Sequence, residues 1–324
     1  MKCLVTGAAG FIGSHLVDRL LSQGHQVIGV DNFSTGQRRF LEQALTQTNF
    51  SLFERDLLDA GTLEGILTPD VTWVFHLAAN ADVRYGFNHP RRDIEQNLLV
   101  TSHLLEVMRK TGVRHIAFSS TGSVYGNTSM IPTPEECPFP LQTSLYATSK
   151  LASEGLISSY AEARHVEGLI FRFVSILGER YSHGHVFDFI RALKKDPSTL
   201  KILGDGAQCK SYLYVGDCID AVLTAIETKP ANPVEIYNLG TDQTVTVNES
   251  ADIICEALAV TPKKFYTGGN KGWPGDNPLI SLDCSKMRRL HWKPQKTIRQ
   301  ALTLTTEYLK QNPWLFDAIA KKEE

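Results

Sequence analysis

The apolar positions of this chain follow two patterns over its first half. Short apolar runs bounded by glycine, proline or polar residues predict buried strands. Longer stretches with apolar residues three or four positions apart predict amphipathic helices between those strands. The expected strands cover residues 2–6, 26–30, 50–53, 71–79, 115–120 and 168–173. The expected helices begin at residue 11 and cover residues 93–110 and 144–165.

Strands that alternate with helices favour a parallel sheet with right-handed crossovers and helices on both faces. The sequence therefore predicts an α/β fold with a doubly wound parallel (Rossmann) sheet over residues 1–174. After about Ser175, turn-forming groups such as Gly204-Asp205-Gly206 separate shorter elements. Residues 175–324 are expected to form a smaller, mixed C-terminal lobe that binds substrate and is interleaved with the sheet.

The first 31 residues form the most informative unit. A glycine-rich turn, residues 7–13, joins the first strand to the first helix. Gly7 permits a sharp turn, Gly10 lets the backbone approach a pyrophosphate, and Gly13 lets helix and strand pack closely. The positive end of the helix dipole would face the phosphates. Asp31 lies 18 residues after Gly13 and ends the next strand, where a carboxylate binds ribose hydroxyls and favours NAD over NADP.

A second motif places a phenol and an ammonium on one face of a helix, since Tyr146 and Lys150 are four residues apart. The ammonium and a positive nicotinamide ring would together lower the pKa of the phenol. The phenolate would then take a proton from a sugar hydroxyl while hydride leaves the same carbon. Thr121, which ends the strand at 115–120, is the expected hydrogen-bonding partner of the reacting oxygen. The structural alternatives are an ordinary surface helix for Tyr146 and Lys150 and an ordinary polar turn for Thr121.

Several motifs together resemble the extended short-chain dehydrogenase/reductase family. They are residues 6–15, 30–36, 76–79, 119–121 and 146–150, with further similarity at 204–206 and 214–217. Within that family the chain is most similar to the NAD-dependent nucleotide-sugar epimerases and dehydratases, in particular those of the UDP-glucose 4-epimerase type. The resemblance implies a tightly held NAD that is reduced and reoxidised in each turnover. It also implies a nucleoside-diphosphate sugar substrate, inverted at C4 through a 4-keto intermediate with no net redox.

The resemblance also implies a role for each residue of the site. Tyr146 would be the base, Lys150 would hold the nicotinamide ribose and tune Tyr146, and Thr121 would assist. The expected cofactor-binding residues are Gly7, Gly10, Phe11, Ile12, Gly13, Asp31, Asn32, Ser34, Thr35, Gly36, Asp56, Leu57, Leu77, Ala78, Ala79, Ser119, Tyr146, Lys150 and Phe173. The expected substrate-binding residues are Arg84, Thr121, Ser123, Ser175, Val186, Lys210 and Lys271. For Arg84, a solvated loop arginine is the alternative.

Departures from the family pattern concern the reaction and the substrate. Residues 122–123 are Gly-Ser where related 4,6-dehydratases carry Asp-Glu, which disfavours dehydration. Ser175 stands where epimerases usually carry asparagine, and Lys210 where they carry arginine. Trp273 replaces a second phosphate-binding arginine, with Lys271 close by. A lysine pairs with a diphosphate as a point charge rather than through a bidentate fork. The identities of the sugar and of the nucleotide base therefore stay open.

Composition narrows the classes of function. A hydrophobic content of 42% and a charged content of 21% are ordinary for a soluble globular protein. The net charge of −2 argues against nucleic-acid or membrane partners bound through bulk charge. No run of about 18 apolar residues predicts a membrane span. The six cysteines lack any CxxC spacing, which favours reduced thiols over disulfides or a metal site. With no basic-then-apolar leader at the N-terminus, we expect a cytoplasmic protein.

Three functions stay open on the sequence alone. The first is epimerisation of a nucleoside-diphosphate sugar by a captive NAD. The second is another enzyme of the same fold, either a nucleotide-sugar dehydratase or a reductase or other net redox enzyme that exchanges NAD(H) with solution. The third is a non-catalytic dinucleotide-binding sensor or scaffold, against which the Tyr146–Lys150 pair argues. The resemblance further implies a homodimer that buries the helices at 93–110 and 144–165.

Overall fold

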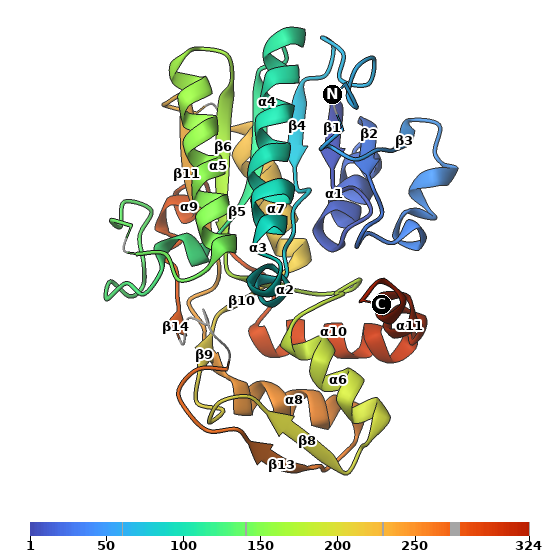
Figure 1. Cartoon of the computed structure of the whole chain (residues 1–324), viewed down its shortest axis with the longest axis vertical. Coiled ribbons are helices and arrows are strands. Elements are labelled where there is room, and N and C mark those ends of the chain that lie inside the picture. The colour runs from blue at the N-terminus through green and yellow to red at the C-terminus, as the bar shows by residue number, and fades with distance from the viewer. Residues whose placement is uncertain (60, 140, 229, 273–278, 324) are drawn as a thin grey trace. The chain divides into compact units, whose positions relative to one another are not determined.

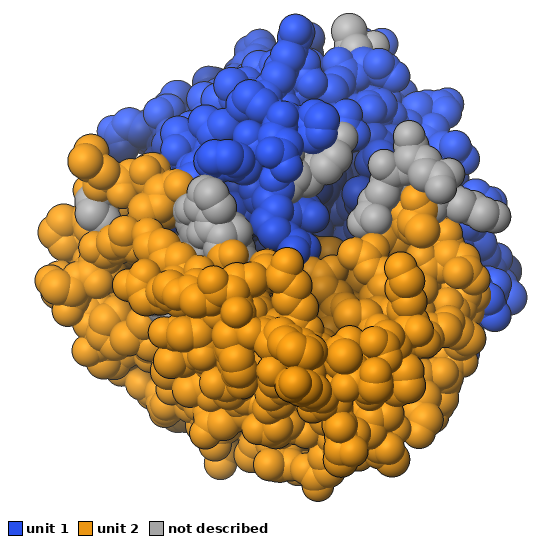
Figure 2. Space-filling model, turned by 60° about the horizontal axis from the view of Figure 1, so that its bottom comes forward, with its two compact units in different colours: residues 1–124, 144–172, 219–237 blue, residues 125–143, 173–218, 238–324 orange. Residues whose placement is uncertain are grey.

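A computed structural model describes residues 1–59, 61–139, 141–228, 230–272 and 279–323. The chain forms two compact units that interleave along the sequence, coloured separately in Figure 2. Unit 1 comprises residues 1–124, 144–172 and 219–237. Unit 2 comprises residues 125–143, 173–218 and 238–324.

A seven-stranded parallel sheet with the order β11-β6-β5-β4-β1-β2-β3 is the frame of the fold. Its strands are β1 (Lys2–Thr6), β2 (Gln26–Asp31), β3 (Phe50–Glu54), β4 (Trp73–His76), β5 (His115–Thr121), β6 (Glu167–Phe173) and β11 (Val234–Leu239). The chain order reverses between β1 and β4, which are hydrogen-bonded neighbours. Ligands of doubly wound sheets bind outside the carboxyl ends of the strands at such a reversal. The predicted fold class is confirmed.

Helices connect the strands of this sheet. They are α1 (Phe11–Ser22), η1 (Arg38–Leu41), η2 (Ala44–Thr46), α2 (Val83–Asn88), α3 (Pro90–Asp93), η3 (Ile94–Leu99), α4 (Val100–Thr111), η4 (Gly122–Tyr125), α5 (Leu145–Glu162) and α7 (Val215–Glu227). Helices α4 and α5 lie side by side along the sheet (Figure 1). Their apolar faces, including Leu104 and Ile157, pack with Val74 and Ile116 of the strands in one buried cluster. This packing is what the helical spacing of their apolar residues predicts.

The helix predicted over residues 93–110 is not a regular α-helix. It starts as α3, which ends at Asp93, continues as the π-helical segment η3, and becomes α-helical again in α4. The carbonyl of Asn97 accepts hydrogen bonds from the hydroxyls of Thr101 and Ser153, at 2.6 and 3.1 Å. A π-helical turn holds one residue more than an α-helical turn and is frequent at functional sites. Apolar periodicity alone did not reveal it.

The fourth strand is also shorter than predicted. It ends at His76, so residues 77–79 leave the sheet instead of extending it. The remaining predicted strands of the sheet agree with the structure to within one residue at each end.

Unit 2 carries small sheets and a group of helices. Its elements are β7 (Ser175–Leu177), α6 (His185–Lys195), β8 (Thr199–Ile202), β9 (Cys209–Lys210), β10 (Tyr212–Tyr214), β12 (Val245–Thr246), α8 (Val247–Leu258), β13 (Lys263–Tyr266), β14 (Leu279–Ile280), α9 (Ser285–Arg289), α10 (Ile298–Gln311) and α11 (Trp314–Glu323). Helices α8 and α10 each begin with a capping box. Helix α10 packs against both α6 and α8. The rings of Phe187 and Phe316 lie 4.6 Å apart.

All six cysteines are free thiols. Across the described residues, no group of histidine, cysteine and carboxylate side chains is arranged to hold a metal ion. Within those same residues, no helix combines the length and the apolar character that crossing a bilayer requires.

A buried ion pair joins α5 to β6 inside unit 1. Arg172 is 1% exposed and donates to both carboxylate oxygens of Glu154, at 3.1 and 2.7 Å. The hydroxyl of Ser120, on β5, also donates to Glu154. The carboxylate therefore links one helix to two adjacent strands. Because both charges are out of water, neither is tolerated without the other.

We predict that Arg172→Met lowers the free energy of unfolding by about 3–5 kcal/mol, because it leaves the Glu154 carboxylate buried and uncompensated. The double variant Glu154→Leu with Arg172→Met should recover most of that loss. Urea denaturation measures both. The matched control is Arg299→Met, which breaks an exposed pair with Glu256 and should cost less than about 1 kcal/mol. A single Arg172→Met variant as stable as the double variant would contradict the prediction.

Candidate functional site

The glycine turn after β1 is closed by contacts that exclude any side chain. Gly7 has φ +69°, and a Cβ built on it would lie 2.8 Å from the backbone nitrogen of Ala78. A Cβ on Gly13 would lie 2.0 Å from the carbonyl oxygen of Gly7. The turn after β1 thus packs directly on the loop after β4, at the reversal of strand order. Sequence reasoning assigned the sharp turn and the close packing to these same two glycines.

The N-terminus of α1 is left open to an anion. Its N-cap residue is Gly10, no side chain of the described residues caps it, and its first turn holds no acidic residue. Helix α5, by contrast, is capped by the Ser144 hydroxyl, which accepts from the amide of Ala147 at 3.1 Å. An uncapped helix end presents backbone N–H donors and a positive dipole, which suits a phosphate group.

The predicted adenosine residues form one connected loop system. The carboxylate of Asp31 accepts from the amides of Ala9 and Phe33, at 2.9 and 2.8 Å. Asn32 donates from its side chain to Asp56 at 2.9 Å and accepts from the amide of Ser34 at 3.0 Å. These bonds tie the loops that follow β2 and β3 to the glycine turn, which gives Asp31 a fixed position beside it.

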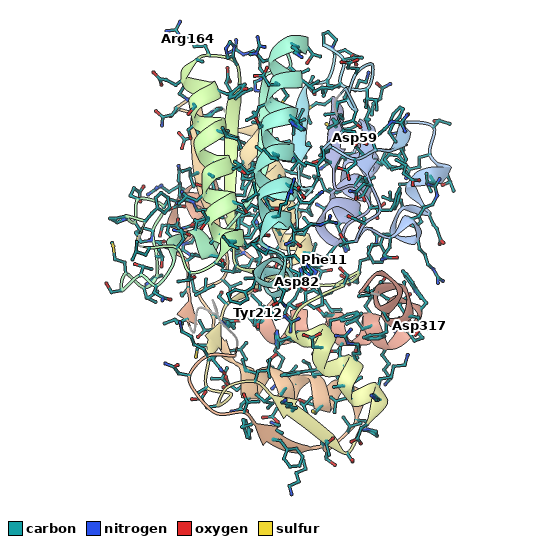
Figure 3. All side chains as sticks on the ribbon, in the orientation of Figure 1. Phe11, Asp59, Asp82, Arg164, Tyr212 and Asp317 are labelled. Atoms are coloured by element: carbon teal, nitrogen blue, oxygen red, sulfur yellow. The ribbon has the colours of Figure 1, made fainter. Side chains whose placement is uncertain are left out.

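The predicted catalytic residues meet at the start of α5. The Thr121 hydroxyl, at the end of β5, forms a hydrogen bond with the phenol of Tyr146. It also accepts from the amide of Ser123 at 3.1 Å, which fixes its orientation. In Figure 3, Arg164 beyond the end of α5 and Asp82 in the loop after β4 lie at opposite ends of unit 1. Tyr146 is in the first turn of α5, and its partner Thr121 ends β5, so this end of α5 lies at the carboxyl ends of the strands.

Lys150 is buried one helical turn beyond Tyr146. Its ammonium donates to the carbonyl oxygen of Ser119 at 2.8 Å and lies 4.7 Å from the centre of the Phe118 ring. Burial lowers the pKa of Lys150 to about 7, although Glu154 and Asp93 act to raise it. The ammonium points to the end of β5, on the side of α5 where the predicted role puts it.

The predicted lowering of the Tyr146 pKa is not produced by the chain alone. Burial raises the pKa of Tyr146 to about 12, the Thr121 hydrogen bond acts to lower it, and the charge of Asp93 acts to raise it. Desolvation opposes the phenolate more strongly than the surrounding side chains favour it. Formation of the phenolate at neutral pH therefore depends on positive charge that arrives with a cofactor.

Comparison with known proteins assigns the chain to a family. Residues 3–240 match the NAD dependent epimerase/dehydratase family. The chain belongs to this family. It is 35% identical over 315 residues to a putative UDP-glucose 4-epimerase of Methanocaldococcus jannaschii, an alignment that covers 95% of this chain and 98% of that protein.

Solved structures agree with that assignment. A UDP-galactose 4-epimerase crystal structure is 36% identical with a TM-score of 0.86, and the match covers 97% of this chain and 100% of the other. The Thermus thermophilus UDP-glucose 4-epimerase in complex with NAD is 32% identical with a TM-score of 0.84, covering 96% of this chain and 99% of the other.

The residues of unit 1 fit the NAD of this family. The open N-terminus of α1 would hold the pyrophosphate, Asp31 would hold the adenine ribose, and Lys150 would hold the nicotinamide ribose. When bound, NAD supplies a hydride acceptor and the positive ring that the Tyr146 phenolate needs.

The predicted substrate residues fall in both units. Arg84 and Ser123 lie in unit 1, where Arg84 Nε is 4.0 Å from the carboxylate of Asp82. Ser175, Val186, Lys210, Lys271 and the predicted cofactor residue Phe173 lie in unit 2. Of these, Ser175 and Lys271 are exposed, whereas Val186 is fully buried. Their contact with a ligand stays a prediction, and Trp273 lies outside the described residues.

Sequence reasoning missed three polar residues beside the site. His76 is fully buried between the hydroxyls of Thr6 and Thr101, at 2.8 and 3.0 Å, and burial lowers its pKa to about 3. Asp93 and Asn97 are the other two, and both are buried. The available signal was a set of polar residues at core-facing positions, His76 on a strand and Asp93 and Asn97 on a helix, which the apolar pattern does not count.

We predict that Gly13→Ala removes bound NAD, because its methyl group would overlap the Gly7 carbonyl and force the turn away from the N-terminus of α1. The measurement is the NAD content of the purified protein, by absorbance after acid release. Gly155→Ala is the control, because nothing lies within 4 Å of that position in α5. Gly13→Ala protein that retains wild-type NAD would refute this account of the turn.

Proposed function

We propose that this protein is an NAD-dependent epimerase that inverts C4 of a nucleoside-diphosphate sugar, of the UDP-glucose/UDP-galactose type. The observation that carries the proposal is the meeting of Thr121, Tyr146 and Lys150 at the carboxyl end of β5, on the same edge of the sheet as the glycine turn. Its membership of the family and its similarity to 4-epimerases along nearly the whole chain support it. In the same proposal, unit 1 binds NAD and unit 2 binds most of the sugar nucleotide.

The residues of the site suit a reversible oxidation. Tyr146 would take the proton of the C4 hydroxyl, and the hydrogen on C4 would leave with its bonding electron pair as hydride, for which bound NAD would supply the acceptor, so that a 4-keto sugar forms. Thr121 hydrogen-bonds the reacting oxygen and limits its orientation. Lys150 stabilises the phenolate by its positive charge. When the hydride returns to the opposite face, Tyr146 gives the proton back and the inverted alcohol forms.

The chain favours epimerisation over dehydration. Loss of water across C5 and C6 requires an acid and a base next to Thr121, and residues 122–123 are Gly-Ser. Neither side chain transfers protons near neutral pH. A net redox reaction would leave the cofactor in its other oxidation state after each turnover, so the cofactor would have to exchange with solution. Epimerisation has no such requirement.

We predict that the purified protein, with no cofactor added, converts at least one member of a panel of UDP-, GDP-, CDP- and dTDP-sugars into its C4 epimer. NMR of the sugar detects the product, and the absorbance of NADH reports any net redox. Turnover only with added NAD, accompanied by accumulation of NADH, would identify a dehydrogenase instead.

Tyr146→Phe is the contrasting variant, because it removes only the phenolic oxygen. We expect at least a roughly 100-fold lower rate with NAD still bound, as is typical for the loss of a general base. A non-catalytic sensor would show the same ligand binding in both proteins and no turnover in either. An equally active Tyr146→Phe variant would exclude Tyr146 as the base.

We propose that the protein acts in the cytoplasm as a homodimer. Ile94 and Leu99 of η3 and Leu145 of α5 are 47%, 41% and 40% exposed, so apolar side chains line the helices that the family resemblance puts at the contact. We predict that sedimentation equilibrium gives twice the mass of one chain. Leu99→Glu should shift the measured mass towards that of the monomer. A monomeric wild-type protein would refute the proposal.

A further inference from the structure

A buried carboxyl group next to the catalytic helix has no assigned role. Asp93, the last residue of α3, is fully buried. Its Oδ1 accepts from the side chain of Asn80 at 2.7 Å, whereas its Oδ2 has no hydrogen-bond partner among the described residues. A Cβ on Gly86 would lie 2.1 Å from Oδ2, so α2 approaches the carboxyl group through a bare backbone. Buried polar atoms are rarely left unpaired without a functional reason.

Asp93 belongs to a chain of hydrogen bonds that ends on α5. The backbone N–H of Asn80 donates to the side-chain oxygen of Asn97 at 2.9 Å. The Asn97 amide donates to the hydroxyl of Ser149 at 2.9 Å, and Ser149 donates to the carbonyl oxygen of Tyr146 at 2.8 Å. Asn97 lies in the π-helical segment η3. The loop that follows β4 is thereby attached to the turn of α5 that carries Tyr146.

Asp93 also acts on this turn through its charge. Glu154, on α5, raises the pKa of Lys150 more than Asp93 does, although its own charge is paired with Arg172. Asp93 forms no ion pair within the described part of the chain, so its charge is not offset in the same way. From β4, His76 faces Lys150 as a neutral imidazole, because its pKa is lowered to about 3.

Asp93 itself is surrounded by groups of both signs. Burial raises its pKa and the Asn80 hydrogen bond lowers it, while Asp82 raises it and Lys150 lowers it. The same carboxylate raises the pKa of Tyr146. Removing its charge should therefore lower the pKa of Lys150 and of Tyr146 together.

We propose that Asp93 is a positioning residue of this site, which holds the loop after β4 against α5 through Asn80 and Asn97 and sets its buried negative charge against the ammonium of Lys150. The inference rests on the proposed roles of Tyr146 and Lys150. It adds a second function to the carboxyl group: besides its hydrogen bonds, it supplies the negative charge that a buried ammonium requires.

The test uses Asp93→Asn, which keeps the shape and one acceptor oxygen but removes the charge. The protein is used as purified, with its cofactor, and its lysine ε-carbons are isotope-labelled. The NMR shift of the Lys150 ε-carbon, assigned with Lys150→Met, then gives the pKa of Lys150 without any measurement of activity. We expect this pKa to lie about one unit below the wild-type value, the lower end of the effect of one nearby opposite charge.

Asp82→Asn is the matched control. Asp82 is in the loop after β4, which also carries Asn80, and its carboxylate raises the pKa of Asp93. Unlike Asp93, it is half-exposed. Its removal should leave the pKa of Lys150 unchanged. A pKa that is the same in wild type and Asp93→Asn, or that falls equally in both variants, would overturn the electrostatic part of the proposal.

The pH dependence of kcat separates positioning from general destabilisation. In Asp93→Asn the limb at high pH, where Lys150 loses its proton, should move down by the same one unit. Asn80→Ser keeps the charge but loses the hydrogen bond to Asp93, so it should lower kcat without moving that limb. Unchanged kcat in Asn80→Ser, or an equal loss at every pH in Asp93→Asn, would refute the assignment.

Two outcomes distinguish this inference from the proposed function. An active Tyr146→Phe variant would end the proposed function, whatever the Asp93 variants do. An inactive Tyr146→Phe together with an unmoved Lys150 pKa in Asp93→Asn would end only the inference. If Asp93→Asn does not fold by circular dichroism, Asn80→Ser still tests the positioning role through kcat.

Discussion

The burial of one ammonium group is the constraint on which the rest of the site depends. Lys150 donates to the carbonyl of Ser119 at the end of β5, and it is removed from water on every other side by packed residues. A desolvated ammonium costs several kcal/mol unless negative charge lies near it. The carboxylates of Glu154 and Asp93 meet that requirement from two different elements. Both carboxylates are buried as well, so Glu154 needs its ion pair with Arg172 and Asp93 needs its hydrogen bond from Asn80.

These requirements explain why unit 1 combines a regular sheet with an irregular helix. The sheet brings the ends of β1, β4 and β5 to one edge, which places the glycine turn, the loop after β4 and Thr121 together. Within the π-helical segment, the Asn97 amide lies 3.5 Å from the Asp93 carboxylate, and the same side chain bonds both Asn80 and Ser149. Asn97 therefore connects the loop after β4 to the start of α5.

The parts of the site that follow local rules were predictable from the sequence. The glycine turn, Asp31 and the Tyr146–Lys150 spacing each depend on neighbours within one βαβ unit or one helical turn, and the structure brings Tyr146 together with Thr121 as expected. Asp93, Asn97 and His76 were not predictable, because their partners lie on elements distant in sequence. The raised pKa of Tyr146 in the chain without cofactor was not predictable for a related reason. Desolvation is set by the packing of the whole unit, and no spacing between two residues reports it.

The two opposite pKa shifts at the start of α5 have one cause. Burial disfavours every charged form, so it raises the pKa of the phenol and lowers that of the ammonium, and both groups approach neutrality. A positive ring beside the phenol would lower the pKa of Tyr146 again, because it stabilises the phenolate. It would not raise the pKa of Lys150, because it repels the ammonium. Negative charge next to Lys150 is therefore most needed when the cofactor is oxidised. Glu154 raises the pKa of Lys150 more than Asp93 does but is also paired with Arg172, so Asp93 adds negative charge that no ion pair of the described residues offsets.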